Sequence, residues 1–409
     1  MLKTILSMRK EEWMDPDALE KLQKERLEKI LKCASNTEYY SPFLRDVKLS
    51  DAVEDLSLLP VSEKQAIRSK PLSLVQKGLD KNSLHSFKTS GTTGIPMTIY
   101  TNRQEAWERM AIVYAQEISQ GRSPFDLYAD ISRDPSPSHP LVSLTGIFRK
   151  LKLNPNEPEP AIYETLAQKR PKMVKGYPSI FTILAKMNRK KLKFKALLSC
   201  GENLTQKTRE FIGESFSCPV LDYYGAWEFR AVGWECPEEK KMHLNSSSLK
   251  IEIVDDKGKP VKSGAGNIVV TSLYNKAMPL VRYSLGDRGS WGACPCGRGY
   301  PVLKSFEGRE PVLIRLPSGK IHPGAHLGVL DIEALYGEIR QFQIVQESEE
   351  RFVFRHSGGE LSEKSRESIS KAILEACLGE EITVEFERVG EIPRGKTGKM
   401  QRVLSKLAL

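Results

Sequence analysis

Residues 89 to 94 place four hydroxyl side chains and two glycines side by side, in the order Thr-Ser-Gly-Thr-Thr-Gly, shortly before Pro96. Glycine tolerates positive φ angles and lets a backbone approach a ligand closely. Hydroxyls and exposed backbone N–H groups donate hydrogen bonds to phosphate oxygens. The stretch lacks the Gly-Lys-Ser/Thr ending of a Walker loop, and taken alone it is equally typical of a polar turn. We predict a phosphate-binding loop made by Ser90, Gly91, Thr92, Thr93 and Gly94.

Two carboxylates further along the chain follow short turns. Glu228 ends the run Tyr224-Gly225-Ala226-Trp227-Glu228, which begins where a strand is expected to end. Ligand sites in α/β sheets lie at such strand ends, and a carboxylate oxygen suits a hard cation such as Mg²⁺. Asp287 ends the run Arg282-Tyr283-Ser284-Leu285-Gly286-Asp287, and a carboxylate accepts two O–H donors at once. Each residue taken alone is more typical of an ordinary loop or turn than of a ligand site.

Five motifs occur in a fixed order along the chain. They are the hydroxyl-glycine loop, the Glu228 run, the Asp287 run, Gly308-Arg309, and Pro393-Arg394-Gly395-Lys396-Thr397-Gly398-Lys399. Together they resemble the adenylate-forming superfamily of acyl-CoA synthetases, carrier-protein adenylation domains and luciferases. The nearest resemblance is to its phenylacetate-CoA ligase-like branch, which His85 and Ala277-Met278-Pro279 also match. The resemblance runs from about Leu58 to the C-terminus.

The resemblance implies a role for each matching residue. Glu228 would hold Mg²⁺ on the ATP phosphates, Asp287 would accept both ribose hydroxyls, and Tyr224 would stack beside the adenine. Lys399 would bridge the substrate carboxylate and the α-phosphate as charge moves between them; a solvated basic loop is the plain alternative for this lysine. The other implied nucleotide contacts are Gly201, Glu202, Gly225 and Arg309. The candidate residues of the acid pocket are Tyr177, Pro178, Tyr223, Ala226 and Trp227.

Three positions depart from the family pattern. Met97 stands where the family has a lysine after the proline of the phosphate loop, and Trp227 stands where it has Ser or Thr before the motif glutamate. One expected phosphate contact is therefore missing, and a bulky ring is expected near the substrate. Val312 stands where the family has an acidic hinge residue, which questions the domain rotation of the second half-reaction.

A second set of residues has the chemistry of a metal site. Cys294-Pro295-Cys296-Gly297 is a tight turn that can aim two thiolates at one ion, and Cys236 and His243 form a pair upstream. Three sulfur ligands and one nitrogen make a closed structural Zn²⁺ site. Unrelated residues in a β-rich region are the alternative, because these spacings are looser than those of a zinc finger.

The composition fits an ordinary globular protein with two or three domains: 409 residues, 40% hydrophobic and 28% charged. No run of 18 apolar residues exists, so we expect no transmembrane helix. The N-terminus is too polar for a secretion signal, and we expect a cytoplasmic protein. Six Lys/Arg residues lie between Lys186 and Lys195, and the net charge is +10. We interpret these as a solvated helix end and a surface suited to ATP and CoA, rather than a nucleic-acid site.

Alternating apolar runs and helical patterns predict an α/β fold with mostly parallel strands in the middle of the chain. Residues from 249 onward change to hairpins. We expect a large domain over 1–307, with a β-rich subdomain at about 235–307, and a small mobile α+β lid domain over 308–409. The lid is expected to contain a hairpin, a helix over 362–377 and a further strand.

The expected function is activation of a carboxylic acid by Mg²⁺ and ATP through an acyl-adenylate, followed by transfer of the acyl group to CoA. The resemblance favours an aryl acid. A carrier protein, an amine or a cofactor hydroxyl are open alternatives to CoA as acceptor, and a homodimer is open. A non-catalytic nucleotide- or nucleic-acid-binding protein is the alternative from another class.

Overall fold

The computed structural model describes residues 1–62, 64–88, 97–132, 146–188, 192–307, 313–323, 327, 338–393 and 400–407. Contacts between residues divide the chain into two compact units. Unit 1 comprises Met1–Arg122 and Leu221–Arg309, and unit 2 comprises Ser123–Val220 and Glu310–Leu409. No helix among the described residues is long and apolar enough to cross a membrane.

The first part of unit 2 is a parallel sheet with the strand order β6-β5-β3-β4. Its strands are β3 (Tyr128–Ile131), β4 (Lys150–Leu153), β5 (Met173–Gly176) and β6 (Ala196–Cys200). The helices between and after them are α8 (Glu159–Lys169), α9 (Pro178–Lys186) and α10 (Gln206–Phe216). A hydrophobic core fills the space between sheet and helices, with Ile131, Phe181 and Leu197 among its buried members. This is the α/β arrangement predicted from the alternating patterns.

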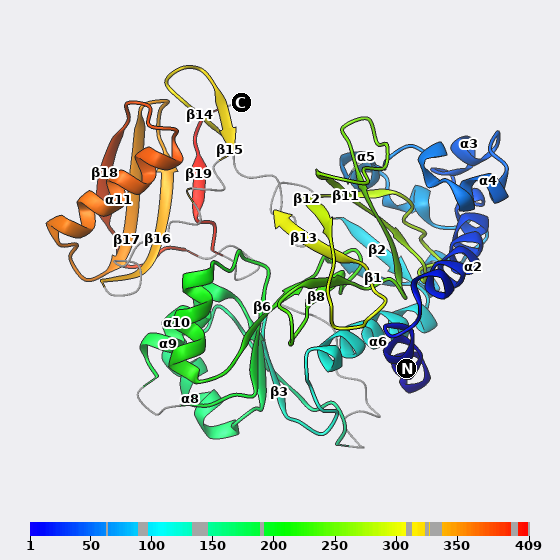
Figure 1. Cartoon of the computed structure of the whole chain (residues 1–409), viewed down its shortest axis with the longest axis horizontal. Coiled ribbons are helices and arrows are strands. Elements are labelled where there is room, and N and C mark those ends of the chain that lie inside the picture. The colour runs from blue at the N-terminus through cyan, green and yellow to red at the C-terminus, as the bar shows by residue number, and fades with distance from the viewer. Residues whose placement is uncertain are drawn as a thin grey trace. The chain divides into compact units, whose positions relative to one another are not determined.

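The C-terminal part of unit 2 has a core of its own, which includes Ile344, Phe354 and Ile369. A four-stranded sheet has the order β18-β17-β16-β19. Helix α11 lies across one face of this sheet (Figure 1). The elements are β14 (Leu313–Arg315), β15 (Ile321–Pro323), β16 (Ile339–Gln346), β17 (Arg351–Gly358), α11 (Glu363–Ala376), β18 (Thr383–Arg388) and β19 (Val403–Ser405). The expected hairpin, helix and strand are all present.

Unit 1 contains an antiparallel sheet with the order β7-β8-β9-β13-β12-β11-β10. Its strands are β7 (Val220–Tyr224), β8 (Gly233–Glu235), β9 (Met242–Leu244), β10 (Leu249–Val254), β11 (Ala265–Ser272), β12 (Tyr283–Gly292) and β13 (Val302–Glu307). A separate antiparallel pair consists of β1 (His85–Lys88) and β2 (Thr98–Thr101), and these strands flank residues 89–96 in the sequence.

The helices of unit 1 come from the first 122 residues. They are α1 (Leu2–Glu11), α2 (Pro16–Ser35), α3 (Ser41–Leu44), α4 (Leu49–Glu54), α5 (Lys64–Ser69) and α6 (Arg103–Ser119), with short 3-10 turns at Leu56–Leu58, Pro71–Leu74 and Lys81–Ser83. A capping box starts α6: the Asn102 side chain accepts from the Glu105 backbone, and the Glu105 side chain accepts from the Asn102 backbone. This reciprocal cap satisfies two donors that a helix start otherwise leaves unpaired.

Candidate functional site

Glu228 lies at the centre of the site in unit 1. Its side chain is buried, with a residue exposure of 2%. The Tyr283 hydroxyl donates to Glu228 Oε1 at 2.9 Å, and Lys64 Nζ lies 3.1 Å from the same oxygen. Burial by itself would raise the pKa of Glu228, but Lys64 and the Tyr283 hydroxyl hold this pKa below its usual value. The carboxylate is therefore charged at neutral pH.

The second oxygen of this carboxylate differs from the first in its hydrogen bonding. Oε2 of Glu228 is buried and finds no hydrogen-bond partner among the described residues. A buried polar atom without a partner is costly, and such atoms often mark the position of an ion, water or ligand. Carboxylate oxygens are ligands that Mg²⁺ accepts. The arrangement therefore fits a divalent cation at Oε2.

Arg109 of α6 fixes the backbone that carries Glu228. Its guanidinium donates to the carbonyl oxygens of Trp227 and Glu228, both at 2.8 Å, and to the Tyr274 hydroxyl at 3.1 Å. Burial lowers the pKa of Arg109. The guanidinium still holds a proton at neutral pH, since an arginine titrates far above that range. A buried positive charge at this turn suits the binding of an anion such as ATP.

The turn before Glu228 requires a glycine. A Cβ atom on Gly225 would lie 2.7 Å from the Arg230 carbonyl oxygen and 3.1 Å from the Tyr223 ring. Only glycine permits this approach without a shift of the backbone. The glycine of the motif therefore has a packing role in addition to the predicted approach to a nucleotide.

Tyr224, at the end of β7, and Asp287, in β12, are joined by a hydrogen bond within unit 1. The Tyr224 hydroxyl donates to Asp287 Oδ2 at 2.6 Å, and both residues are buried. The Tyr224 ring also packs on Phe306, with 4.2 Å between ring centroids. The structure thus pairs two residues that the motifs assigned to the nucleotide, Tyr224 and Asp287, and Glu228 follows Tyr224 by four residues in the same unit.

Lys64 was not among the predicted site residues. It opens the short helix α5, and its side chain reaches Glu228. Met97 is fully buried, and the Tyr283 hydroxyl lies 3.4 Å from its sulfur. No motif in the sequence indicated Lys64, and the departure at Met97 indicated only that one expected phosphate contact is missing.

Trp227 is partly buried, and its ring stacks with a neighbour in the same turn. The Arg230 guanidinium lies 5.5 Å from the centroid of the Trp227 ring. Ala226 is also partly buried, and Tyr223 is buried at the end of β7. A cation over a tryptophan face is an attractive arrangement, so Arg230 holds the ring in one orientation.

The remaining described candidates lie in unit 2, at the carboxyl ends of adjacent parallel strands. Tyr177 and Pro178 follow β5, and Gly201 and Glu202 follow β6. Gly201 has φ +74°, which an L side chain rarely adopts. Such strand ends are where α/β sheets bind ligands. The phosphate loop 89–94, Arg309 and Lys399 lie outside the described residues.

The four predicted metal ligands also come together in unit 1. One ligand atom from each of Cys236, His243, Cys294 and Cys296 lies within 4.8 Å of the others. Zn–S bonds of about 2.3 Å put the ligands of one tetrahedral ion roughly 3.7 Å apart. The cluster needs only a small contraction to hold an ion.

The surroundings of His243 favour a metal-binding tautomer. Nδ1 faces the Tyr300 carbonyl oxygen at 3.3 Å, while Nε2 lies 3.3 Å from Cys296 Sγ. A carbonyl can only accept, so Nδ1 carries the hydrogen and Nε2 is left to bind. Burial lowers the pKa of His243 to about 4, which keeps the ring neutral at pH 7. Trp234 stacks on this ring at 4.9 Å.

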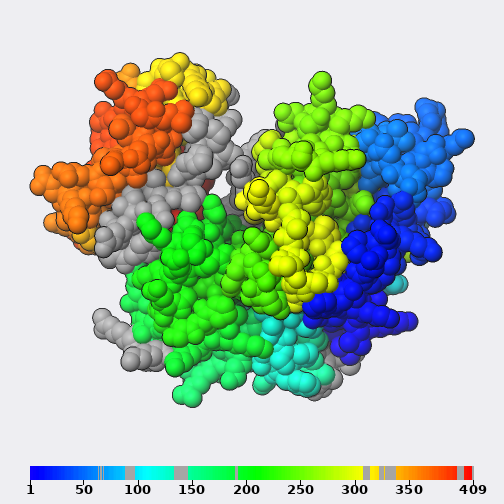
Figure 2. Space-filling model, in the orientation of Figure 1, coloured from blue at the N-terminus to red at the C-terminus, as the bar shows by residue number. Residues whose placement is uncertain are grey.

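The residues that follow the cysteine turn contact the N-terminal segment. The Gly299 N–H donates to the Glu12 carbonyl at 2.9 Å, and the Arg298 guanidinium lies 4.5 Å from the Trp13 ring centroid. Figure 2 shows the N-terminal residues in dark blue against the yellow residues near 300. The cluster therefore lies where two distant parts of the sequence join.

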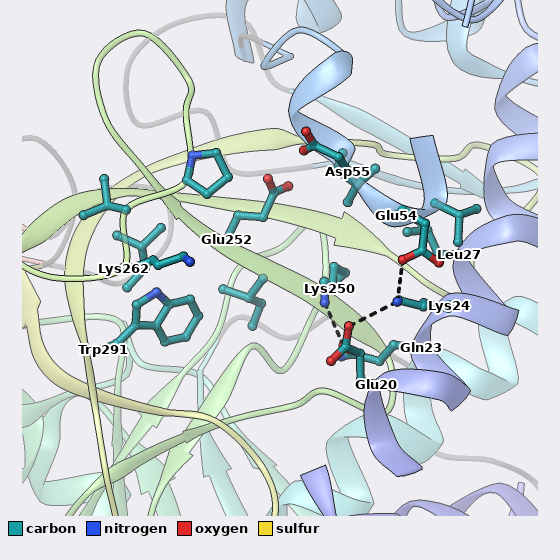
Figure 3. Close-up of a pocket in the computed structure, with 16 residues that line it drawn as sticks. Glu20, Gln23, Lys24, Leu27, Glu54, Asp55, Lys250, Glu252, Lys262 and Trp291 are labelled. Atoms are coloured by element: carbon teal, nitrogen blue, oxygen red, sulfur yellow. Dashed lines mark hydrogen bonds and ion pairs between the residues drawn. The ribbon is translucent and has the colours of Figure 1, made fainter. Parts of the chain in front are cut away.

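A cleft of about 440 Å³ in unit 1 contains none of the predicted site residues. It lies beside α2 and β10, where Lys24 pairs with Glu20 and Glu54 (Figure 3). Lys250 donates to Gln23 at 3.3 Å. None of the described residues that line the cleft has a buried side-chain oxygen or nitrogen without a partner.

Comparison with known proteins gives two curated relatives. The sequence is 28% identical to "Phenylacetate-coenzyme A ligase" of Thermus thermophilus over 270 residues, which is 58% of this chain and 60% of that protein. It is 24% identical to "Protein CapK" of Staphylococcus aureus over 286 residues, or 65% of this chain and 62% of that protein. The chain thus spans about three fifths of the length of the curated relatives it matches. No family model matches the sequence.

Among solved structures, a 2-hydroxyisobutyryl-CoA ligase in the postadenylation state, in complex with R3-HIB-AMP, has a TM-score of 0.78. The match covers 97% of this chain and 91% of that structure, at 20% sequence identity. A likeness at this identity shows the fold, and it shows it over nearly the whole chain. The fold expected from the motifs is therefore confirmed.

Proposed function

From the resemblance of this chain to the phenylacetate-CoA ligase-like branch of the adenylate-forming superfamily, in motifs, sequence and fold, we propose that it is an AMP-forming acid–thiol ligase. In the first half-reaction an oxygen of the substrate carboxylate attacks the α-phosphorus of ATP and pyrophosphate leaves. In the second half-reaction the CoA thiolate attacks the acyl carbon and AMP leaves. ATP is consumed once for each thioester formed.

The observation that carries the proposal is the Glu228 carboxylate. It is charged and buried, one oxygen is held by Lys64 and Tyr283, and the other has no partner among the described residues. We assign Oε2 to Mg²⁺ on the ATP phosphates. A bound Mg²⁺ would neutralise charge on the phosphates, and the contacts of Tyr283 and Lys64 with Oε1 would hold the carboxylate in one orientation.

Asp287 and Tyr224 are assigned to the nucleoside. A carboxylate accepts O–H donors, so Asp287 is suited to the ribose hydroxyls once its orientation is fixed. Tyr224 fixes it through the 2.6 Å hydrogen bond to Oδ2. We also assign Tyr224, Gly225 and Gly201 to the nucleotide, because the resemblance implies these contacts. The loop residues Ser90, Gly91, Thr92, Thr93 and Gly94 are assigned to the phosphates.

Three cations support an anionic ligand in unit 1. Lys64 contacts Glu228, Arg109 holds the carbonyl oxygens of Trp227 and Glu228, and Arg230 stands over Trp227. We propose that Lys64 supplies the charge that the family places at the position of Met97. A positive field in a buried site attracts ATP and stabilises the charge that develops on its phosphates.

Lys399 is assigned to the first half-reaction, where its ammonium bridges the substrate carboxylate and the α-phosphate. We propose that residues 308–409 act as a lid domain that carries this lysine, with Arg309 at its start, and that residues 1–307 form the larger domain. The separate hydrophobic core of the C-terminal sheet and α11 supports a lid that is stable in itself.

The acid pocket is assigned to Tyr177, Pro178, Tyr223, Ala226 and Trp227. The Trp227 ring offers a flat apolar surface, which favours a small or aryl acid over a long flexible chain. The binding partners in this proposal are a carboxylic acid, ATP and CoA. A carrier protein as acceptor, a homodimer and a cytoplasmic location stay predictions.

The Cys/His cluster is proposed to hold a structural Zn²⁺ ion with Cys236, His243, Cys294 and Cys296 as ligands. Three sulfurs and one nitrogen fill the four positions that zinc takes in structural sites and leave none for a substrate. The contacts of Tyr300 and Arg298 with the N-terminal segment support a role in holding the fold together.

The proposal is tested by incubating the protein with ATP, Mg²⁺, CoA and a panel of aryl, hydroxyaryl, amino and fatty acids. Acid-dependent formation of AMP, pyrophosphate and a CoA thioester, measured by mass spectrometry, is the expected result. Acid-dependent pyrophosphate without a thioester would move the acceptor to a carrier protein, an amine or a hydroxyl. Nucleotide binding without any acid-dependent pyrophosphate would contradict an enzyme of this class.

A further inference from the structure

The side chain of Glu202 contacts two segments of unit 2 that are far apart in the sequence. Its Oε2 accepts from the Ser179 N–H at 3.0 Å, and its Oε1 accepts from the Ser179 hydroxyl at 3.0 Å. The same Oε1 accepts from the Met400 N–H at 3.1 Å. Ser179 lies in the first turn of α9. A carboxylate is stabilised there by the partial positive charge of the helix start.

Met400 directly follows Lys399 in the sequence. It is buried, with 8% exposure. Bonds to β16 hold the chain on both sides of residues 394–399: Gln341 Oε1 accepts from the Ile392 N–H at 2.9 Å, and Gln343 Nε2 donates to the Gln401 carbonyl at 2.9 Å. Two glutamine side chains of β16 therefore hold the backbone near each end of residues 394–399.

Two other contacts join the C-terminal sheet to the helices of the parallel sheet within unit 2. Arg340 Nη2 lies 2.6 Å from Glu159 of α8, and Lys186 of α9 donates to the Ile339 carbonyl. Both involve the first residues of β16. Of these contacts, the bond from Met400 to Glu202 is the one that adjoins Lys399 in the sequence.

We infer that Glu202 is a positioning residue for acyl-adenylate formation: its carboxylate anchors the amide of Met400, the neighbour of Lys399 in the sequence, to the start of α9. The inference rests on the proposed function. The Met400 amide belongs to the peptide group that joins Met400 to Lys399. Anchoring this amide lowers the conformational freedom that the chain has to lose when Lys399 acts in the transition state.

The test is Glu202→Ala, with Arg340→Ala as the matched control. The control removes a contact between the same two parts of unit 2 without touching Met400. Each variant is assayed for two separate steps: pyrophosphate release in a single turnover with acid and ATP, and thioester formation from chemically prepared acyl-AMP and CoA. Glu202→Gln is included because its amide oxygen retains one acceptor, and partial activity is expected of it.

We expect Glu202→Ala to lower the rate of adenylation about 10- to 100-fold, with the KM for ATP unchanged and thioester formation from supplied acyl-AMP retained. Arg340→Ala should leave adenylation within about twofold of the wild-type rate. Equal slowing of both steps in Glu202→Ala would overturn the inference, because it indicates general damage. A raised KM for ATP with normal kcat would also overturn it and assign the carboxylate to the adenine.

Hydrogen–deuterium exchange of the intact protein gives a readout that does not depend on turnover. The Met400 amide should exchange faster in Glu202→Ala than in wild type and Arg340→Ala. Unchanged exchange at Met400 would overturn the anchor itself. If the wild type forms no acyl-AMP with any acid, the proposed function fails and the role in adenylation fails with it, while the exchange measurement still decides whether Glu202 holds Met400.

Discussion

Two sites in unit 1 use buried side chains in different ways. The Glu228 carboxylate has one oxygen held by Lys64 and Tyr283 and a second buried oxygen without a described partner. The Cys/His cluster has four converging ligand atoms, and the non-binding nitrogen of His243 is already held by Tyr300. The first arrangement leaves one buried oxygen available to a ligand that binds and dissociates. The second offers four ligand atoms, which is the number that a structural zinc ion takes.

The contrast extends to the surroundings of the two sites. Around Glu228 there are several cations, including Lys64 and Arg109, which suit an anion that brings its own metal. Around the cluster, the contacts are with the N-terminal segment, through Gly299 and Arg298. Loss of the first site should therefore abolish catalysis, and loss of the second should loosen the fold. The predictions below test that division.

The largest effect is expected from Lys399→Ala. The lysine's charge is needed mainly in the transition state, so kcat should fall on the order of 10²-fold or more while ATP binding changes little. Single-turnover pyrophosphate release and ATP titration measure the two quantities. Acyl-AMP formation at the wild-type rate would remove Lys399 from the mechanism.

Glu228→Gln should also lower acyl-AMP formation, by on the order of 10²-fold. The amide keeps the shape of the side chain and removes the charge that we assign to Mg²⁺. The apparent affinity for Mg²⁺ should weaken, and zinc content should stay at the wild-type value. A normal Mg²⁺ dependence of the rate in this variant would show that the cation lies elsewhere.

Removal of the cluster should act on stability. Cys294→Ser with Cys296→Ser should abolish bound zinc, from about one ion per chain, and lower the melting temperature, because metal-binding energy at a structural site is folding energy. Elemental analysis and thermal unfolding measure both. The folded fraction should still bind ATP. Freshly purified wild-type protein without zinc would contradict the assignment.

Lys64→Met should reverse the direction in which Glu228 makes the stability depend on pH. In the wild type, the lowered pKa of Glu228 contributes stability that is present above the unfolded-state pKa and is lost as pH falls through the folded-state pKa. Without Lys64, burial should raise this pKa, so the variant loses stability as pH rises from about 4 to 7. The cost should reach about 1–3 kcal/mol at pH 7.

Urea unfolding of the wild type and Lys64→Met at pH 4 and pH 7 measures this difference. Equal destabilisation at both pH values would mean that Lys64 does not act through the charge of Glu228. Lys70→Met is a matched control, because Lys70 follows the same helix and is exposed.

The smallest effect is expected from Trp227→Ser. Removing the ring that Arg230 stacks on should widen the range of accepted acids and restore a hydroxyl for a phosphate. The relative kcat/KM of larger acids should rise severalfold, on the scale of one or two buried methylenes. An acid profile parallel to that of the wild type would show that Trp227 does not shape the pocket.

The sequence indicated most of the elements around the site. The helix expected over 362–377 is α11, Glu363–Ala376, and the alternating patterns in the middle of the chain correspond to the strands and helices from β3 to α10. The pairing of Tyr224 with Asp287 was not predictable. It depends on how β7 and β12 are placed in one unit, although 63 residues separate the two side chains.

The contacts of Lys64 and Glu202 were missed for a related reason. Lys64 belongs to a helix of six residues, which is too short to give a periodic signal. Glu202 was assigned from a motif, and a motif does not show that Ser179 and Met400 approach the same carboxylate. The Cys/His cluster was predictable because three thiolates and one imidazole are the ligand types of a structural zinc site.

The central claim is that the chain joins a carboxylate to AMP, and isotope transfer tests it most directly. An accepted acid labelled with ¹⁸O in both carboxylate oxygens is turned over with ATP, Mg²⁺ and CoA, and the products are weighed by mass spectrometry. One carboxylate oxygen becomes the bridge to the α-phosphorus, so the account predicts AMP that carries one ¹⁸O for each thioester formed. Label in inorganic phosphate with ADP as the product, or AMP without label, would contradict it.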